Sequence, residues 1–418
     1  MRRCSLGALH RRKFGSRVNV WARVTDVRDR RVGKPGLVEA HLADESGHAL
    51  LVWQGEPPPV GSLVRLSADW LSPGTLTGPR FLQVQPPTAP FAYAASEFAA
   101  TQIRASRLRQ RASLLREVRA HFERQGFLEV ETPLVVPSPG LDVHLDAMAV
   151  QTKWGERYLI TSPEYQMKRL LSGGLERIFQ ICKCFRNDEL GERHQPEFTM
   201  LEWYRAFAGV EDVMRDTEEL VARLARELSR TLHSHDLAIA GKPILRTAFG
   251  DVDVTPPWRR ITMREALQKF CSVDMDEVVQ DEERFYRLLI DEVEPRLGEL
   301  GAVFLCEYPT SMASLARKKP GDEAVAERFE AYVAGIELCN GFGELTDAIE
   351  QRARLQADFA SRQRLGLPAY PIDERFLAAL EQGMPPSGGN ALGLDRLLML
   401  ALGAGQIEDV LAIGASRL

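Results

Sequence analysis

The first part of the chain, from residue 16 to residue 84, consists of short runs in which apolar and polar residues alternate. Gly, Pro and Asp-Glu turn residues separate these runs, and this pattern is typical of β-strands joined by tight turns. Five short strands in so short a stretch predict a small closed β-barrel. The predicted strands are Arg17–Val27, Leu37–Ala43, His48–Val52, Ser62–Ala68 and Phe81–Val84.

An OB-fold is the best match to a five-stranded barrel of this size, and many OB-folds bind single-stranded nucleic acid on exposed aromatic side chains. Trp21, Trp53 and Trp70 lie in or next to the predicted strands and are candidates for such a surface. The pattern favours a place in the barrel core for these side chains, and it leaves the surface role open.

Apolar residues recur at helical spacing after residue 101. Leu114, Val118 and Phe122 form one apolar stripe, which predicts an amphipathic helix over about residues 102–125. The Pro- and Ala-rich stretch before this helix is typical of a linker. These patterns divide the chain into a barrel over residues 1–84, a linker over residues 85–101 and a second domain over residues 102–418.

The overall composition limits the roles that the chain can have. It has 418 residues, 44% of them hydrophobic and 27% charged, as in ordinary soluble proteins of two or three domains. No apolar run approaches the roughly 18 residues of a membrane span, and the six cysteines show no spacing typical of a zinc site. We therefore expect a protein of the reducing cytoplasm without a membrane segment.

The formal net charge is −5, so a nucleic-acid role would require a local basic patch. Four arginines crowd the first half of the helix predicted at about residues 102–125, but a solvated helix face is the favoured interpretation. They are Arg104, Arg107, Arg109 and Arg111.

The first segment with candidate chemistry is residues 177–205, which predicts a strand, a polar loop and a returning strand. Alternation places Gln180 and Arg186 on one face of the first strand, with Arg186 where the loop could close over a ligand. Glu202 and Tyr204 share a face of the returning strand. A guanidinium beside a carboxylate suits a site that holds a phosphate and an amine together. Spacing alone favours the alternative, an ordinary hairpin with an edge salt bridge.

A second candidate segment, residues 327–347, predicts a β-hairpin around an Ala-Gly turn. The expected register places Glu330 opposite Cys339 and Glu337 opposite Tyr332. The two carboxylates would then share a face at diagonal positions roughly 7–8 Å apart. Carboxylates at this separation can bind Mg²⁺ ions that accompany a nucleotide triphosphate.

The third candidate segment, residues 385–403, predicts a glycine-rich strand that leads into an apolar helix. Glycines allow the backbone to approach a flat ligand such as adenine closely. Arg396 lies in the first turn of this helix, where it could meet a phosphate. A glycine-rich turn alone is more often structural than functional.

Three segments resemble the sequence motifs of class II aminoacyl-tRNA synthetases, and they occur in the same order. Residues 126–133 resemble motif 1, residues 185–188 resemble motif 2 and residues 393–396 resemble motif 3. The resemblance covers about residues 102–418. It implies an α+β fold in which an antiparallel sheet is flanked by helices, here preceded by the OB-like barrel. It also implies a homodimer that pairs through motif 1.

Within this class, residues 162–170 and 337–347 are similar to the substrate-binding segments of the lysyl branch. The resemblance implies that Glu164 binds the α-amine of the substrate. The residues implied at the distant amine are Glu202, Tyr204 and Glu344. The other residues implied at the amino acid are Ser162, Pro163, Asn340, Phe342 and Ala391.

The resemblance also implies a site for ATP and Mg²⁺. The expected reaction begins when the amino-acid carboxylate attacks the α-phosphate of ATP, with Arg186 and Arg396 as catalytic residues. The expected metal ligands are Glu330 and Glu337. The residues expected at ATP are Arg186, Asn187, Asp188, Gln195, Phe198, Glu337, Leu338, Gly393 and Arg396.

Some positions resemble the elongation factor P β-lysine ligases more closely than the tRNA synthetases. Those ligases attach β-lysine to a lysine side chain of elongation factor P. Ser162 stands where synthetases commonly have Ala, and Ala391 stands where they have Gly. Two departures from the common motif 2, Asp188 in place of Glu and Gln195 in place of Asn, keep the chemical type.

The predicted barrel is the one feature that resembles the synthetases instead of the ligases. Three functions therefore stay open. The favoured one is transfer of lysine or β-lysine to elongation factor P. The others are the charging of tRNA with lysine and the binding of a ligand or RNA by a paralogue without catalysis.

Overall fold

The structure is a computed structural model that describes residues 3–29, 37–93, 96–187, 189–232 and 242–418. The chain forms two compact units, Met1–Arg109 and Gln110–Leu418, and each has its own hydrophobic core. The boundary between the units falls within helix α1 (Glu97–Arg124). This helix begins five residues earlier than predicted, so the stretch between it and the barrel is shorter than the predicted linker.

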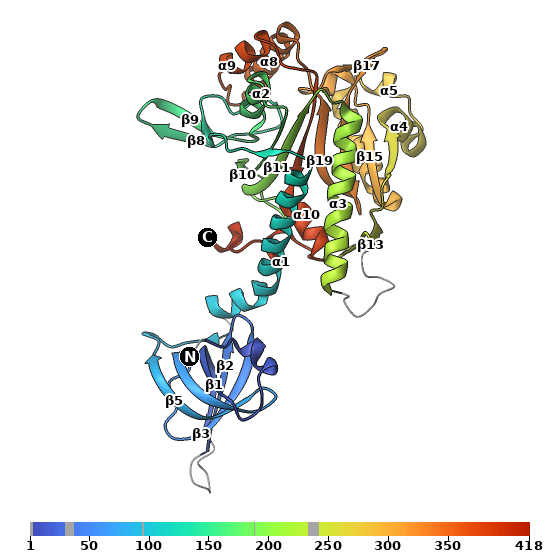
Figure 1. The fold of residues 1–418 in the computed structure, drawn as a ribbon. Coiled ribbons are helices and arrows are strands. Elements are labelled where there is room, and N and C mark those ends of the chain that lie inside the picture. Colours follow the sequence, from blue (N-terminus) through green and yellow to red (C-terminus); the bar gives the residue numbers. More distant parts are fainter. Residues whose placement is uncertain (1–2, 30–36, 94–95, 188, 233–241) are drawn as a thin grey trace. The chain divides into compact units, whose positions relative to one another are not determined.

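Five strands of the first unit close into a barrel in the order β1-β2-β3-β5-β4 (Figure 1). The prediction of a small closed barrel is therefore confirmed, although the last strand begins before Phe81. The core is filled by inward-facing side chains such as Val20, Leu42 and Leu66. The strands are β1 (Arg17–Asp29), β2 (Leu37–Asp44), β3 (Gly47–Gln54), β4 (Leu63–Ser72) and β5 (Thr75–Gln85).

The three barrel tryptophans do not share one environment. Trp53 and Trp70 are buried in the core, as predicted. The same prediction is wrong for Trp21, whose side chain is 47% exposed. Val20 and Ala22 point into the core, so strand alternation turns Trp21 to the outside.

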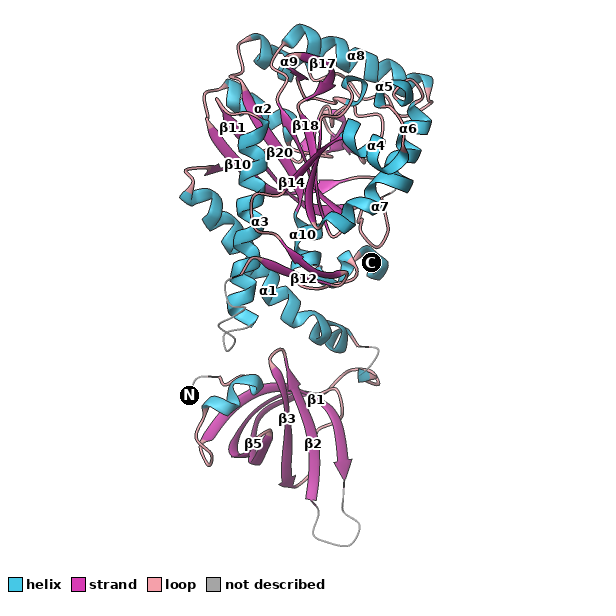
Figure 2. Ribbon diagram, turned by 90° about the vertical axis from the view of Figure 1, so that its right-hand side faces the viewer, coloured by secondary structure: helices cyan, strands magenta, loops and turns pink. Residues whose placement is uncertain are grey.

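The second unit is built on an eight-stranded sheet with the order β14-β15-β18-β19-β20-β11-β10-β6 (Figure 2). Its central strands pair antiparallel, and only the outermost pairs are parallel, which confirms the expected α+β fold. The strands are β6 (Leu128–Glu129), β10 (Arg177–Phe185), β11 (Glu197–Ala206), β14 (Arg259–Thr262), β15 (Ala302–Cys306), β18 (Arg328–Val333), β19 (Ile336–Gly343) and β20 (Ser387–Gly393).

Helices cover both faces of this sheet (Figures 1 and 2). The C-terminal half of α1, α3 (Val210–Leu232) and α10 (Leu394–Ala401) pack on one face, against side chains such as Trp203 and Leu392. A separate apolar cluster joins α2 (Glu164–Ser172), α8 (Ala348–Arg364) and α9 (Glu374–Glu381) to Tyr204 and Phe342, which point to the other face. The predicted buried stripe of Leu114, Val118 and Phe122 is confirmed.

The remaining elements lie around this sheet. The small strands are β7 (Val135–Val136), β8 (Ala149–Thr152), β9 (Gly155–Leu159), β12 (Ile244–Thr247), β13 (Gly250–Asp253), β16 (Lys318–Lys319) and β17 (Asp322–Ala326). The other helices are α4 (Met263–Cys271), α5 (Met275–Val278), α6 (Glu282–Leu288) and α7 (Glu294–Leu297). Short 3-10 or π segments span Leu6–Arg11, Leu289–Val293, Gly298–Leu300, Thr310–Met312, Ile407–Val410 and Ala415–Arg417.

The hairpin of β18 and β19 forms as predicted, but its register differs from the expected one. Glu337 lies opposite Tyr332, which agrees with the prediction. Glu330 lies opposite Asn340 and not opposite Cys339, because the pairing shifts by one residue between Ala331 and Tyr332. The two glutamates still face the same side of the sheet.

Two expectations from composition can be compared with the described residues. None of the helices in the described ranges is long and apolar enough to cross a membrane. All six cysteines are free thiols.

Candidate active site

The floor of the candidate site is a row of side chains on one face of the eight-stranded sheet. Residues that pair directly across antiparallel strands share a face. Glu202 on β11 pairs with Gln180 on β10 and with Ala391 on β20. Asn340 on β19 pairs with Ala391 and with Glu330 on β18. The sheet therefore brings together residues from five strands that are widely separated along the chain.

A second row of side chains lies beside the first, and it explains why residue 389 of β20 is a glycine. Tyr204 and Phe342 both pair with Gly389. A Cβ at Gly389 would lie 2.3 Å from the Glu344 Oε1 atom and 2.3 Å from a ring carbon of Tyr204. Only glycine leaves room for these two side chains to meet over the strand.

A cavity of about 240 Å³ opens above this floor. Its wall includes parts of all three segments that the sequence singled out. The predicted site residues that line the cavity are Ser162, Glu164, Arg186, Gln195, Phe198, Glu337, Leu338, Asn340, Phe342, Ala391, Gly393 and Arg396. The predicted site residues that do not line it are Pro163, Asn187, Glu202, Tyr204, Glu330 and Glu344. Asp188 lies outside the described residues.

The Glu202 carboxylate is buried directly behind the cavity wall. It accepts a hydrogen bond from the Ser162 hydroxyl at 2.8 Å and one from the Tyr204 hydroxyl at 2.5 Å. Burial and the nearby Glu164 raise the pKa of Glu202 well above its usual value. The hydroxyl of Ser162, a position that set the chain apart from tRNA synthetases, therefore contacts a carboxylate of the predicted amine site.

A fully buried lysine holds the other two carboxylates of this layer. The Lys168 Nζ atom lies 2.5 Å from Glu164 Oε1 and 2.5 Å from Glu344 Oε2. Burial alone would lower the pKa of Lys168, but the two carboxylates raise it above its usual value. Burial raises the pKa of Glu344 to about 7, and the Lys168 charge opposes this rise. The Glu344 Oε1 atom accepts no hydrogen bond from the described residues, whereas Oε2 is held by Lys168.

Sequence reasoning gave Lys168 no role, although one signal was present. Lys168 follows Glu164 by four residues, and this spacing places the two side chains on one face of α2. The second partner, Glu344, lies far away in sequence and could not be predicted from local spacing.

Two arginines project toward the other end of the cavity. The Arg186 guanidinium lies 5.0 Å from the centroid of the Phe198 ring and 3.4 Å from a Glu189 carboxylate oxygen. The Arg396 Nη1 atom donates to the Glu337 carboxylate at 3.1 Å, and Nη2 lies 2.6 Å from the His194 ring. Burial tends to raise the pKa of Glu337, but Arg396 lowers it overall.

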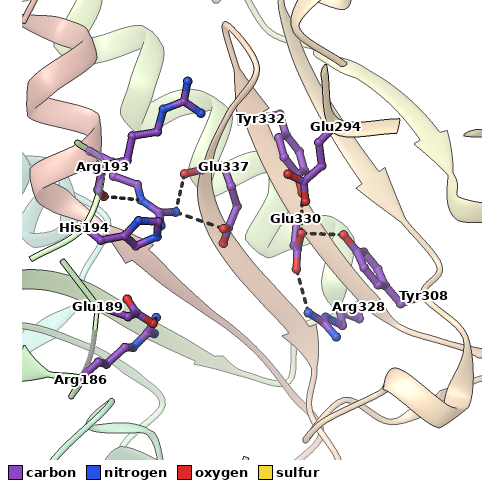
Figure 3. A network of polar contacts seen from close by, with 11 residues as sticks. Arg186, Glu189, Arg193, His194, Glu294, Tyr308, Arg328, Glu330, Tyr332 and Glu337 are labelled. Carbon is purple, nitrogen blue, oxygen red and sulfur yellow. Dashed lines mark hydrogen bonds and ion pairs between the residues drawn. The ribbon is translucent and has the colours of Figure 1, made fainter. Parts of the chain in front are cut away.

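Glu330, the other predicted metal ligand, already has three donors. Its carboxylate accepts hydrogen bonds from Arg328 at 2.7 Å, from Tyr308 at 2.6 Å and from Tyr332 at 2.8 Å (Figure 3). Glu337, in contrast, lines the cavity with a side chain that is 39% exposed. Within the described part of the chain, no three His, Cys, Asp or Glu side chains are grouped so as to hold a metal ion.

Two residues predicted to bind ATP have hydrogen-bond partners within the chain. Gln195 accepts a hydrogen bond from the Ala415 amide at 2.9 Å. Asn187 donates from its side chain to the Asp146 carboxylate at 3.1 Å. Gln195 still reaches the cavity wall, whereas Asn187 does not.

The interpretation of the arginine-rich helix face as solvated is wrong for Arg111. Its Nη1 atom lies 2.6 Å from the buried Asp395 carboxylate, which also accepts the Thr199 amide at 2.7 Å. Arg111 therefore anchors the start of α10, and with it the neighbouring Arg396, to the rest of the unit. This role was not visible in sequence because Asp395 lies near the other end of the chain.

A family model described as tRNA synthetases class II (D, K and N) matches residues 92–417. The match covers most of the chain and includes every residue of the site described above. The chain belongs to the class II tRNA synthetase family. The barrel strands lie outside the matched residues.

Among the relatives of this class II chain are several proteins named elongation factor P (R)-β-lysine ligase. The protein from Edwardsiella ictaluri is 42% identical over 320 residues, which are 74% of this chain and 95% of the relative. The protein from Proteus mirabilis is 42% identical over 318 residues, and that from Salmonella gallinarum is 40% identical over 317 residues, with the same coverage. The resemblance to this ligase family is therefore confirmed.

The ion pairs of Lys168 predict how the class II unit responds to a change at this position. Lys168→Met keeps most of the side-chain volume but leaves the buried Glu344 and the half-buried Glu164 without a counter-charge. Breaking a buried ion pair costs about 3–5 kcal/mol. Burial makes the ionised form of the Glu344 carboxylate unfavourable and raises its pKa to about 7. This ionised form is more abundant at pH 8 than at pH 6. We expect urea unfolding to show a larger loss of stability at pH 8 than at pH 6.

Two control variants make this measurement decisive. Lys168→Met combined with Glu344→Gln removes the stranded charge and should recover much of the lost stability. Lys318→Met removes a lysine whose partner Glu323 is exposed, and it should cost at most about 1 kcal/mol. A Lys168→Met protein as stable as the native chain at pH 8 would show that the buried ion pair does not hold the site together.

Proposed function

We propose that the chain uses ATP to activate (R)-β-lysine and then transfers it to a lysine side chain of elongation factor P. The observation that carries this proposal is the layer of buried carboxylates with a single internal ammonium, placed behind a cavity that also contains two arginines. One end of such a cavity suits a molecule with cationic amines. The other end suits phosphates.

The charges of the buried layer match a diamino acid. Lys168 offsets one of the three negative charges of Glu164, Glu202 and Glu344. Two ammonium groups of a substrate would offset the other two, and a buried carboxylate gains most from such a partner. The Glu344 Oε1 atom accepts no hydrogen bond from the described residues, so it is suited to the distant amine. Glu164 faces the cavity and suits the amine nearer the carboxylate.

The arginines would stabilise the charge that develops during activation. The substrate carboxylate attacks the α-phosphate of ATP, a bond to this phosphorus forms and pyrophosphate leaves. Arg186 would bind the α-phosphate and Arg396 the γ-phosphate, each through charge-assisted hydrogen bonds. The Phe198 ring and the close backbone at Gly393 would hold the flat adenine between them.

The second step needs no nucleophile from the protein. The lysine amine of the acceptor attacks the carbonyl carbon of the mixed anhydride, an amide forms and AMP leaves with the electrons of the broken bond. Activation has already supplied the driving force for this transfer. The protein's task in this step is to hold the adenylate and to exclude water.

The residues present fit a role for Mg²⁺, which proteins usually bind through one or two carboxylates together with substrate phosphates. Glu337 is the better-placed ligand, because it lines the cavity and is partly exposed. Its bond to Arg396 would have to open for this purpose. Glu330 is held by three donors, two of them on Oε2, so its predicted role as a second ligand would use the acceptor site left on Oε1. When bound, the ion would offset charge on the phosphates.

Exposed apolar side chains in motif 1 and just after it support a homodimer. Leu128 and Val135 are both exposed in the single chain, on the short strands β6 and β7. Apolar side chains on neighbouring segments are common where two copies pair about a two-fold axis.

A second candidate function, the charging of tRNA with lysine, has its own support. The matching family model describes tRNA synthetases, and the chain carries a barrel that the matched residues do not include. The two functions share the first step and differ only in the acceptor. A comparison of the two acceptors under one set of conditions therefore separates them.

Purified full-length chain with ATP, Mg²⁺ and radiolabelled (R)-β-lysine should label elongation factor P and leave tRNA unlabelled. Protein and RNA products are separated by gel electrophoresis, and a reaction with labelled α-lysine is run beside it. Glu337→Gln, which should lose pyrophosphate exchange, serves as the inactive control. If the label enters tRNA and not elongation factor P, the proposed function is wrong and the second candidate function takes its place.

Ala391 should set the preference for the amino-acid isomer. It pairs with Glu202, so its methyl group lies in the row of the predicted amine site. A difference of one methylene in a tight pocket discriminates about 10- to 200-fold. We expect pyrophosphate exchange to favour β-lysine over α-lysine by at least about tenfold. Ala391→Gly should shift this ratio toward α-lysine.

The matched control for this experiment is Ala353→Gly, at an exposed position on α8. It should leave the ratio of the two isomers unchanged. An unchanged ratio in Ala391→Gly as well would show that this methyl group only packs against the nucleotide or the sheet.

A further inference from the structure

Ser314 has a backbone conformation that serine rarely adopts. Its φ is +51°, in the left-handed region that favours glycine. The residue is second in a tight turn over residues 313–316, which the Ala316 amide closes by donating to the Ala313 carbonyl at 2.9 Å. Turns with a positive φ at this place usually have Gly, Asn or Asp there. Strain of this kind persists where neighbouring groups hold the residue, and it is common at functional sites.

The place of this strained residue sets it apart from others like it. Five non-glycine residues of the described ranges have a positive φ, and Ser314 is the only one of them that lines the cavity of the candidate active site. Two of the others have local explanations, because Ser272 ends α4 as its C-cap and Ala334 lies in the β18–β19 turn. The five are Phe207, Ser272, Glu307, Ser314 and Ala334.

The turn is held firmly on both sides of Ser314. The Arg354 guanidinium on α8 donates to the Ser314 carbonyl at 2.9 Å and to the Ala316 carbonyl at 2.7 Å. Ser314 itself is exposed, and its hydroxyl has no partner among the described residues. The buried neighbours are Met312, Ala313, Leu315 and Ala316. The fold therefore presents one hydroxyl at the rim of the cavity.

Asp142 lies at the same rim. It is exposed and lines the cavity, and its carboxylate accepts a hydrogen bond from the His144 backbone amide at 2.8 Å. It forms no ion pair with the described residues. Helix α8 also holds this segment, since Arg362 donates to the Asp142 carbonyl at 2.6 Å. The rim thus offers a carboxylate and a hydroxyl, which suit a cationic amine that arrives from outside.

We propose that Ser314 positions the lysine side chain of the acceptor for the transfer step, and that Asp142 attracts its charged amine to the cavity. This inference rests on the proposed function. The Ser314 hydroxyl would accept a hydrogen bond from the neutral amine and direct its lone pair at the carbonyl carbon of the adenylate. The C–N bond then forms, the bond to AMP breaks and the amine proton passes to water. Holding the two reacting groups in this geometry lowers the barrier to attack.

Two assays on the full-length chain separate the two steps. Pyrophosphate exchange follows activation, and single-turnover transfer from preformed β-lysyl-adenylate to elongation factor P follows the second step. Ser314→Ala removes the hydroxyl and should slow transfer about 5- to 10-fold, the effect of losing one hydrogen bond. It should slow exchange much less. Asp142→Asn should raise the KM for elongation factor P.

Ser314→Gly removes the hydroxyl and the strain together. It should slow transfer as much as Ser314→Ala, yet raise the melting temperature by about 2 °C, because glycine adopts this φ without strain. Ser314→Asn tolerates the left-handed backbone and keeps a hydrogen-bond acceptor, so it should recover part of the transfer rate.

The matched control is Ser272→Gly. Ser272 has a φ of +56°, ends α4 and does not line the cavity. Its replacement should raise the melting temperature as Ser314→Gly does and leave both assays unchanged. Slow transfer that is confined to the variants of Ser314 then comes from the lost hydroxyl and not from a change in stability.

Transfer that is unchanged in both Ser314→Ala and Ser314→Gly would overturn the inference. Pyrophosphate exchange that falls as much as transfer would overturn it too, because Ser314 would then contact the amino acid or ATP. If the native chain transfers nothing to elongation factor P, the proposed function fails and this inference fails with it. That result is visible before any variant is made, so the two failures are distinguishable.

Discussion

The ion pairs of Lys168 with Glu164 and Glu344 are the interaction on which the rest of the site depends. Two carboxylates, Glu202 and Glu344, are buried behind the cavity and Glu164 lies in its wall, and one internal ammonium offsets only part of their charge. Isolated buried charges are costly, so the folded protein keeps a site that a cationic ligand would stabilise. Stability of the fold and selection of the substrate are thus linked through the same four side chains.

The sheet is what makes this concentration of charge possible. Strands β11, β19 and β20 place Glu202, Asn340 and Ala391 in one row, and Gly389 leaves space for Glu344 above the next row. The opposite face of the same strands packs on α3 and α10, so the floor is rigid. A single antiparallel sheet therefore supports the amine end and the phosphate end of one cavity.

Local patterns were sufficient to predict the strands of the barrel and the β18–β19 hairpin, because each depends on neighbouring residues. The three motif segments were identified by their resemblance to a known family. Long-range partners were not predictable. The pairing of Glu330 with Asn340 depends on a bulge that the sequence pattern does not reveal, and the burial of Arg111 depends on Asp395. The outward position of Trp21 was missed because alternation gives two faces without saying which one is the core.

The buried carboxylates are expected to select a substrate with a second ammonium group. Pyrophosphate exchange with β-lysine and with (R)-3-aminohexanoic acid, which lacks only the distant amine, tests it most directly. We expect exchange with the analogue to fall at least about 100-fold, because a buried carboxylate is left without its partner. Glu344→Gln should reduce this difference. Equal exchange with the two compounds in the native chain would contradict the account.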